Sequence, residues 1–164
     1  MNDTAGSWSY SNARVAALVT LRMLIGWHFL YEGLVKVLND RWTAAGFLTE
    51  SQGIFSGFFN WLASQPLAVV DFANRWGLIL IGVGLIAGLL TRYATLAGML
   101  LLALYYLSNP PLPGLIYSQP TEGSYLIVNK VLIEAAALWV LLLFPTGQIV
   151  GLDRWLTRKT GGAR

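Results

Sequence analysis

Four ionisable side chains interrupt the first long hydrophobic segment of this chain, which runs from about residue 15 to residue 38. They are Arg22, His28, Glu32 and Lys36. An α-helix turns by about 100° per residue, so all four fall within roughly one third of its circumference. At the centre of a bilayer each charge costs on the order of 2.5–3.5 kcal/mol, whereas each Leu, Ile, Phe or Val contributes only about 0.3–0.6 kcal/mol. The charged face therefore has to meet polar partners or water.

The composition indicates a membrane as the solvent. The 164 residues are 55% hydrophobic and 12% charged, with a mean hydropathy of +0.57, whereas a soluble domain has roughly 25% charged residues. The alternating pattern of a lipid-facing barrel strand is not favoured. Because the first segment is long, carries charges and lacks a small-residue cleavage site, we expect a retained span and not a signal peptide. The sequence predicts an integral membrane protein.

We predict four membrane spans, at about residues 15–38, 72–90, 93–107 and 125–144. Only a few residues separate the second span from the third, so these two form a tight antiparallel hairpin. The third span is short for a hydrocarbon core of about 30 Å. The predicted fold class is all-α, a single integral membrane four-helix bundle that comprises residues 1–164.

The region between the first two spans, residues 39–71, is rich in large aromatic side chains. It contains Trp42, Phe47, Phe55, Phe58, Phe59 and Trp61. Polar residues at 49–52 divide it into two pieces, which we expect to be short interfacial helices. The aromatic side chains there fit two roles, as anchors in the membrane interface or as a lid over a ligand.

The distribution of Lys and Arg predicts the orientation in the membrane. One side carries Arg14, Arg92, Arg154, Arg158, Lys159 and Arg164, and the other side carries Arg41 and Arg75. The positive-inside rule then places both termini in the cytoplasm, which requires an even number of spans. We expect a multi-pass protein of the cell inner (cytoplasmic) membrane, with residues 39–71 on the outer side.

The first and fourth spans run in opposite directions and bring polar groups to one depth. At about 1.5 Å per residue, His28 lies near mid-membrane and Lys36 about 12 Å further out. The fourth span places Asn129 and Lys130 in the outer half and Glu134 near the middle. Two sets of ion pairs satisfy these charges: Glu32 with Lys36 and Lys130 with Glu134 along each helix, or Glu32 with Lys130 and Lys36 with Glu134 between helices.

The residue types that are missing exclude several kinds of redox centre. The chain has no cysteine and one histidine, which excludes disulfides, thiolate catalysis, iron–sulfur ligation and a bis-histidine haem within it. No metal site is evident. Basic residues are not clustered, so no nucleic-acid partner is expected. Any catalysis would need a partner subunit, a bound organic cofactor or direct chemistry between an electron donor and its acceptor.

Several short motifs are spread over most of the chain. They read Arg22-x-x-x-Gly26-Trp27-x-Phe29-Leu30-x-x-Gly33-x-x-Lys36, Gly77-x-x-x-x-Gly82-x-Gly84 before Leu90-Thr91-Arg92, Asn129-Lys130, and Gly151-Leu152-Asp153-Arg154. Together they resemble the DoxX/DoxD family of small four-helix membrane proteins. Where the family would have an acidic residue at the start of the second helix, this chain has Asn74-Arg75-Trp76.

This resemblance implies a function in quinone chemistry. Family members are associated with membrane oxidoreductases, thiosulfate:quinone oxidoreductase being the better-defined case. The resemblance implies a quinone-reactive membrane subunit that works with a partner subunit. It would pass electrons from a donor on the outer side into the quinone pool. Quinone reduction adds two electrons and two protons, so a site needs an apolar slot, cationic donors and proton carriers.

Candidate residues for such a site come mainly from the first and fourth spans. The candidate catalytic proton carriers are His28, Glu32 and Glu134. The candidate cofactor-binding residues are Arg22, Lys36, Asn129, Lys130 and Trp27. Phe29, Tyr31 and Trp139 are further candidates for the walls of a quinone slot.

Other functions fit the same residues. The charged face would also serve a small transporter or proton-conducting protein. The aromatic region and the Pro-rich loop after the third span would serve a non-catalytic anchor or assembly partner for a soluble enzyme. Mutual neutralisation of Arg22, Glu32 and Lys36 within the bundle would give fold specificity and no chemistry.

Overall fold

The computed structural model describes residues 12–118 and 126–155. In them the chain forms α1 (Asn12–Leu38), α2 (Ala45–Thr49), α3 (Ser56–Ala63), α4 (Ala68–Ala87), α5 (Thr91–Ser108), α6 (Lys130–Leu143) and the 3-10 helix η1 (Thr146–Gln148). These described ranges contain no β-strand, so the predicted all-α class is confirmed. The start of the predicted fourth span at Tyr125 and the tail cations Arg158, Lys159 and Arg164 lie outside the described residues.

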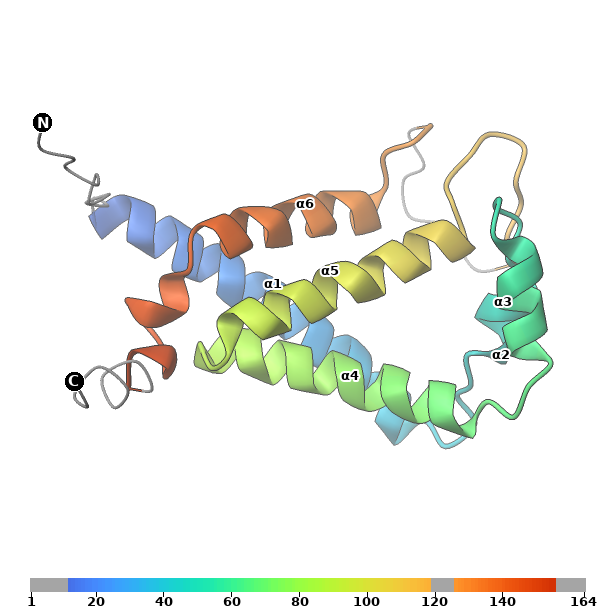
Figure 1. The fold of residues 1–164 in the computed structure, drawn as a ribbon, viewed down its shortest axis with the longest axis horizontal. Helices are drawn as coiled ribbons and strands as arrows, with labels where there is room; N and C mark the ends of the chain where they lie inside the picture. Colours follow the sequence, from blue (N-terminus) through green and yellow to red (C-terminus); the bar gives the residue numbers. More distant parts are fainter. Residues whose placement is uncertain (1–11, 119–125, 156–164) are drawn as a thin grey trace, which may run out of the picture.

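The long helices α1, α4, α5 and α6 run alongside one another (Figure 1). The start of α1, the turn between α4 and α5, and η1 lie at one end, which we call the hairpin end. Helices α2 and α3 lie at the other end, the α2–α3 end (Figure 1). The sequence placed the start of the first span, the turn at Arg92 and the region of Arg154 on one side of the membrane. In the structure these segments lie at one end of the fold.

One hydrophobic core joins the four long helices. Its buried residues are Ile25 and Phe29 of α1, Leu78, Ile81 and Leu85 of α4, Leu102 of α5, and Leu138 and Leu141 of α6. A smaller core of Ala44, Leu48 and Phe59 holds α2 against α3. The helical spacing of apolar residues supplies both cores.

Glycines allow α1 and α4 to approach closely. A Cβ atom on Gly82 would lie 2.5 Å from the backbone nitrogen of Leu30, and one on Gly33 would lie 2.7 Å from Ile79 Cγ1. Small residues at a helix interface are a common packing device in membranes, where lipid is as apolar as the side chains. The tight α1–α4 contact fixes how the polar face of α1 is presented to the other helices.

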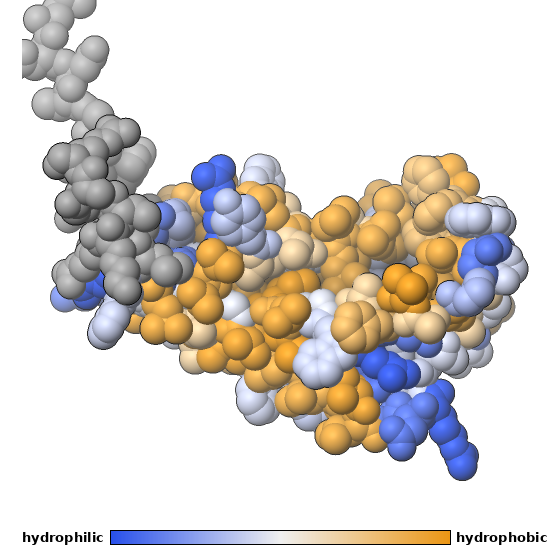
Figure 2. All heavy atoms as spheres, turned by 60° about the horizontal axis from the view of Figure 1, so that its bottom comes forward, coloured by the Kyte–Doolittle hydropathy of each residue, from blue (hydrophilic) through white to orange (hydrophobic). Residues whose placement is uncertain are grey.

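The outer surface of the long helices is largely hydrophobic. Among the described residues, α1 and α4 are the two helices long and apolar enough to cross a membrane. Figure 2 shows hydrophobic residues over much of one face of the molecule, with strongly hydrophilic residues toward its two ends. Large apolar side chains such as Leu24, Leu80 and Leu100 are more than 60% exposed. Such a surface suits lipid and not water.

Local signals explain where α6 begins and where α4 ends. Helix α6 begins at Lys130 because Asn129 is extended and its side chain accepts a hydrogen bond from the backbone N–H of Leu132 at 3.0 Å. Helix α4 ends at Ala87, where Gly88 adopts a left-handed conformation with φ of 64°. Helix α5 then begins at Thr91, so α4 and α5 are joined by the short connection that the sequence predicted.

Candidate functional site

A cavity of about 680 Å³ opens at the α2–α3 end. Its lining comes from the C-terminal end of α1, from α2, from α4 and α5, and from the start of α6. The lining residues that matter below are Glu32, Lys36, Trp42, Phe47, Asn74, Tyr105, Asn129 and Lys130. Four of them, Glu32, Lys36, Asn129 and Lys130, are candidates that the sequence singled out, so the structure brings these four to one cavity.

Lys36 is a largely buried cation in this cavity, with 15% of its side chain exposed. Its Nζ lies 3.7 Å from Glu32 Oε2 and donates a hydrogen bond to Asn74 Oδ1 at 3.4 Å. The same Nζ lies 5.2 Å from the centroid of the Trp42 ring and 5.5 Å from that of Tyr105. An ammonium group is stabilised by carboxylate, amide oxygen and aromatic faces alike. Of the ion pairs that the sequence allowed, the structure contains Glu32–Lys36.

Asn74 connects Lys36 to a tyrosine that the sequence did not single out. Asn74 Nδ2 donates to the hydroxyl oxygen of Tyr105 at 2.6 Å. The Tyr105 ring packs edge-to-face against Phe47, with centroids 5.5 Å apart. Helices α1, α4 and α5 therefore each contribute one member of a polar row within an aromatic wall.

The segment after α1 is held over the cavity by α4. Arg75 donates a hydrogen bond to the backbone carbonyl of Trp42, and its guanidinium lies 5.2 Å from the Trp42 ring centroid. Asp71 Oδ1 accepts a hydrogen bond from the N–H of Ala44 at 2.8 Å. The residues Asn74 and Arg75, which depart from the family pattern, thus have defined partners at the site.

The segment directly after α2 is tied to the end of α5 and to the loop that follows α5 by side-chain hydrogen bonds. Ser51 donates to the carbonyl of Ser108 and Gln52 to that of Ile116, each at 2.6 Å. Glu50 accepts hydrogen bonds from both the N–H and the hydroxyl of Ser118. Burial raises the pKa of the Tyr117 hydroxyl, which stays protonated and donates to the carbonyl of Pro110 at 2.9 Å. These bonds fix the rim of the cavity.

His28 and Glu134 form a second polar contact between α1 and α6. His28 Nδ1 lies 2.7 Å from Glu134 Oε1, with 33% of the histidine and 10% of the glutamate side chain exposed. Both residues are one helical turn from the cavity, since Glu32 follows His28 by four residues and Lys130 precedes Glu134 by four. One turn is about 5.4 Å. The pair extends the polar row from the cavity toward the centre of the helices.

Arg22 lies apart from the cavity, at the hairpin end. Its side chain is buried, and it donates to Thr146 Oγ1 at 3.0 Å and to the carbonyl of Val150 at 2.7 Å. A Cβ atom on Gly88 would lie 2.7 Å from the Cα of Gly151 and 3.2 Å from Arg22 Nη2, so a glycine suits this crowded position. Arg22 is therefore not among the groups that line the cavity, although it was a candidate for cofactor binding.

The Gly151-Leu152-Asp153 motif closes the same end of the fold. Asp153 accepts hydrogen bonds from the N–H groups of Leu90 and Thr91 at 2.6 and 3.0 Å, and also from the Thr91 hydroxyl. The N–H of Asp153 donates to the carbonyl of Gly88 at 2.8 Å. A carboxylate at a helix N-terminus satisfies donors that lack intrahelical partners. This motif therefore has a structural role at the start of α5.

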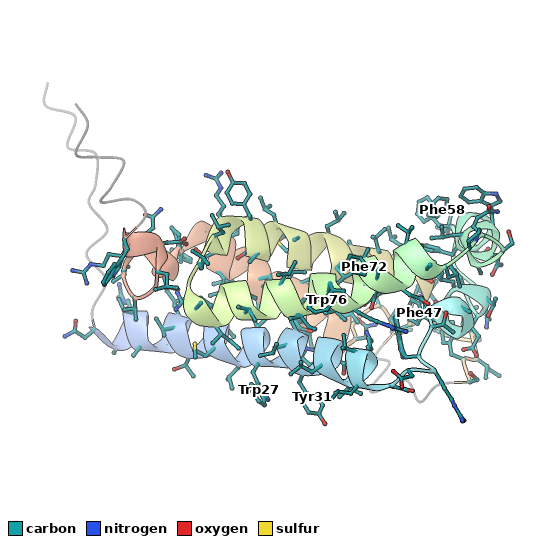
Figure 3. All side chains as sticks on the ribbon, turned by 90° about the horizontal axis from the view of Figure 1, so that it is seen from below. Trp27, Tyr31, Phe47, Phe58, Phe72 and Trp76 are labelled. Carbon is teal, nitrogen blue, oxygen red and sulfur yellow. The ribbon has the colours of Figure 1, made fainter. Side chains whose placement is uncertain are left out.

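Trp27 points away from the other helices. Its side chain is 59% exposed, and Figure 3 shows Trp27 and Tyr31 projecting together from the outer side of α1. Their ring centroids are 6.5 Å apart. Neither side chain lines the cavity, whose aromatic wall comes from Trp42, Phe47 and Tyr105.

The cavity residues missed by the sequence analysis carried little signal. Asn74 and Tyr105 belong to helices that read as apolar spans, and Trp42 and Phe47 were considered as interfacial anchors or as a lid. Within residues 12–118 and 126–155, no group of three or more His, Asp or Glu side chains is placed to hold a metal ion. The site is an aromatic and polar cavity in which Lys36 is a largely buried cation.

Comparisons with known proteins identify the family. Residues 17–108, more than half of the 164, match the DoxX family. The matched segment extends from α1 to the end of α5 and includes Glu32, Lys36, Asn74 and Tyr105. A search of curated proteins and a search of solved structures found no match. With this family match and two helices able to cross a membrane, the chain belongs to the DoxX family of membrane proteins.

Proposed function

We propose that this protein is the membrane subunit of a quinone-linked oxidoreductase and that the cavity at the α2–α3 end takes the quinone ring. The observation that carries the proposal is the composition of the cavity lining. The rings of Trp42, Phe47 and Tyr105 line the cavity, and those of Trp42 and Tyr105 lie beside a largely buried cation, Lys36. Its volume of about 680 Å³ lies within the roughly 300–1,000 Å³ typical of small-molecule sites. The DoxX family is itself associated with quinone oxidoreductases.

Each polar group has a task in this proposal. Lys36 stabilises negative charge that develops on a quinone oxygen, as preorganised cations do at other reaction centres. Glu32 and the His28–Glu134 pair carry protons, because a carboxylate and an imidazole joined by a 2.7 Å contact exchange a proton readily. Asn129 and Lys130, at the start of α6, also line the cavity.

The proposed topology is a four-helix bundle that spans the inner membrane with both termini in the cytoplasm. Arg14, Arg92 and Arg154 all belong to the hairpin end, which supports placing that end inside. Phe58 and Trp61 of α3 are more than half exposed at the other end, as anchors in the outer interface would be. The cavity then opens on the outer side, next to the lipid phase where quinones dissolve.

The electron donor is proposed to be a partner subunit on the outer side, with thiosulfate as the substrate by analogy with the better-defined family case. The chain has no cysteine and a single histidine, so a cysteine-held cluster or a bis-histidine haem would have to belong to that partner.

The test is purification in a mild detergent from the native membrane, followed by identification of bound quinone and of proteins that travel with the chain. Quinone reduction is then measured in the intact complex with Lys36→Met and Glu32→Gln. Each variant is expected to lower turnover at least tenfold. Asp40→Asn, an exposed carboxylate just beyond α1, is the matched control.

Other outcomes favour other functions. If the Lys36 and Glu32 variants reduce quinone normally, the cavity is not the site. If these variants recover less of the partner protein, while each complex that still forms reduces quinone at the normal rate, the chain is an anchor. A solute or proton flux in liposomes without any redox partner indicates a transporter.

A further inference from the structure

We infer that the Tyr105 hydroxyl, oriented by Asn74, donates a hydrogen bond to an oxygen of the ligand in this cavity, next to Lys36. The inference rests on the proposed function and deepens it. The ligand is then recognised by two donors, the ammonium group of Lys36 in α1 and the hydroxyl of Tyr105 in α5, which converge on one acceptor oxygen. For a quinone this oxygen is a ring carbonyl.

The direction of each hydrogen bond follows from Lys36. An ammonium group only donates, so the Asn74 atom that faces Lys36 at 3.4 Å is the amide oxygen. The amide nitrogen then faces Tyr105, and the hydroxyl oxygen of Tyr105 accepts its hydrogen bond at 2.6 Å. Because the hydroxyl oxygen accepts from Asn74, its own hydrogen points elsewhere.

The Tyr105 hydrogen needs an acceptor, and none of the described residues supplies one. Within the described ranges, the hydroxyl of Tyr105 has its one hydrogen bond with Asn74, in which it accepts. Tyr105 lines the cavity, so its O–H is available to whatever occupies the space. Partly buried donors are usually satisfied by an acceptor, from protein, water or ligand.

Lys36 adds a second donor beside the first. Its ammonium group has three N–H bonds, and Glu32 and Asn74 account for two of them. Lys36 Nζ and the Tyr105 hydroxyl are both hydrogen-bonded to the Asn74 amide group, which places the two donors near each other, and a carbonyl oxygen has two lone pairs with which to accept from both. Trp42 and Phe47 provide flat apolar walls on which a quinone ring would stack. Two donors favour an acceptor oxygen over a ligand group that must itself donate.

Direct binding of a short-chain benzoquinone to the full chain in lipid nanodiscs tests the inference without any electron donor. Tyr105→Phe removes the hydroxyl and keeps the ring, and it is expected to raise Kd about tenfold. Tyr106→Phe is the matched control, because the Tyr106 hydroxyl donates to the carbonyl of Ile127 at 2.8 Å and not into the cavity. The Kd of Tyr106→Phe for the benzoquinone is expected to stay within about twofold of that of the unaltered chain.

Asn74→Asp tests the orientation of the hydroxyl. An ionised aspartate accepts from both Lys36 and Tyr105, so it turns the Tyr105 hydrogen away from the cavity. The Kd is expected to rise as in Tyr105→Phe, and the double variant is expected to bind no more weakly than either single one. A purely structural role of Asn74 predicts instead that the two losses add.

The possible results separate the two proposals. If the unaltered chain binds quinone and Tyr105→Phe binds it equally well, the donor pair is wrong while the quinone site stands. If the unaltered chain binds no quinone, both the proposed function and this inference are overturned. Thermal unfolding of each variant shows whether a weaker Kd reflects lost folding.

Discussion

His28 Nδ1 lies 2.7 Å from Glu134 Oε1, so the one histidine of the chain joins α1 to α6. The contact gives Glu134 a partner different from the two that the sequence suggested, which were Lys130 along α6 and Lys36 across the helices. Glu134 is the more buried partner, with 10% of its side chain exposed. A largely buried carboxylate needs a donor close by, and the imidazole supplies it.

We predict energetic coupling between these two side chains. His28→Gln and Glu134→Gln are each expected to lower the free energy of unfolding by about 1–3 kcal/mol, because each leaves a part-buried polar partner unsatisfied. The double variant is expected to lose less than the sum of the two. The measurement is a double-mutant cycle from chemical unfolding in detergent micelles. Strictly additive losses would show that the two groups do not interact.

Arg22 is predicted to stabilise the fold and not to bind quinone. Arg22→Met leaves the buried hydroxyl of Thr146 and the carbonyl of Val150 without their donor, and about 2 kcal/mol or more of stability should be lost. The Kd for quinone of the folded fraction should be unchanged, because the cavity lies at the opposite end. Arg92→Met removes an exposed cation near the same end and should change neither quantity. A specific loss of quinone affinity in Arg22→Met would contradict this assignment.

Two glycines of α4 are predicted to differ sharply when replaced by alanine. In Gly82→Ala the new Cβ would lie 2.5 Å from the Leu30 backbone nitrogen, so α1 and α4 must separate. Overpacking of this kind costs about 1–3 kcal/mol. In Gly77→Ala the Cβ meets nothing within 4 Å, and alanine is the better helix former by up to about 1 kcal/mol. Thermal unfolding should show a lower Tm for the first variant only, and equal Tm values would refute the proposed packing.

Two tryptophans are predicted to differ in their effect on quinone binding. Trp42→Phe should weaken binding several-fold, because the indole lines the cavity and its ring centroid lies 5.2 Å from both the Lys36 ammonium and the Arg75 guanidinium. Trp27→Phe should leave the Kd unchanged, because that side chain projects outward (Figure 3). Titration of both variants with the same short-chain benzoquinone checks this. The opposite ranking would restore Trp27 as a binding residue.

The sequence by itself determined the helices and the polarity of their faces. Residues 22, 28, 32 and 36 share one face of α1 because helical periodicity is set locally, by hydrogen bonds between near neighbours. The same periodicity indicated that polar groups of the first and last long helices meet. His28 and Glu134 do so, and Glu32, Lys36, Asn129 and Lys130 share one cavity.

Only the tertiary structure decided which partner each polar group has. Arg22 and Lys36 share a helical face, yet about 21 Å of helix separates them. Arg22 donates to Thr146 at the hairpin end, whereas Lys36 donates to Asn74 in the cavity at the α2–α3 end. Asn74, Tyr105 and Trp42 come together because glycine contacts set the approach of α4 to α1 and because α5 returns beside α4. Local propensity carries no information about such contacts, since residues distant in sequence meet only when the whole apolar surface packs.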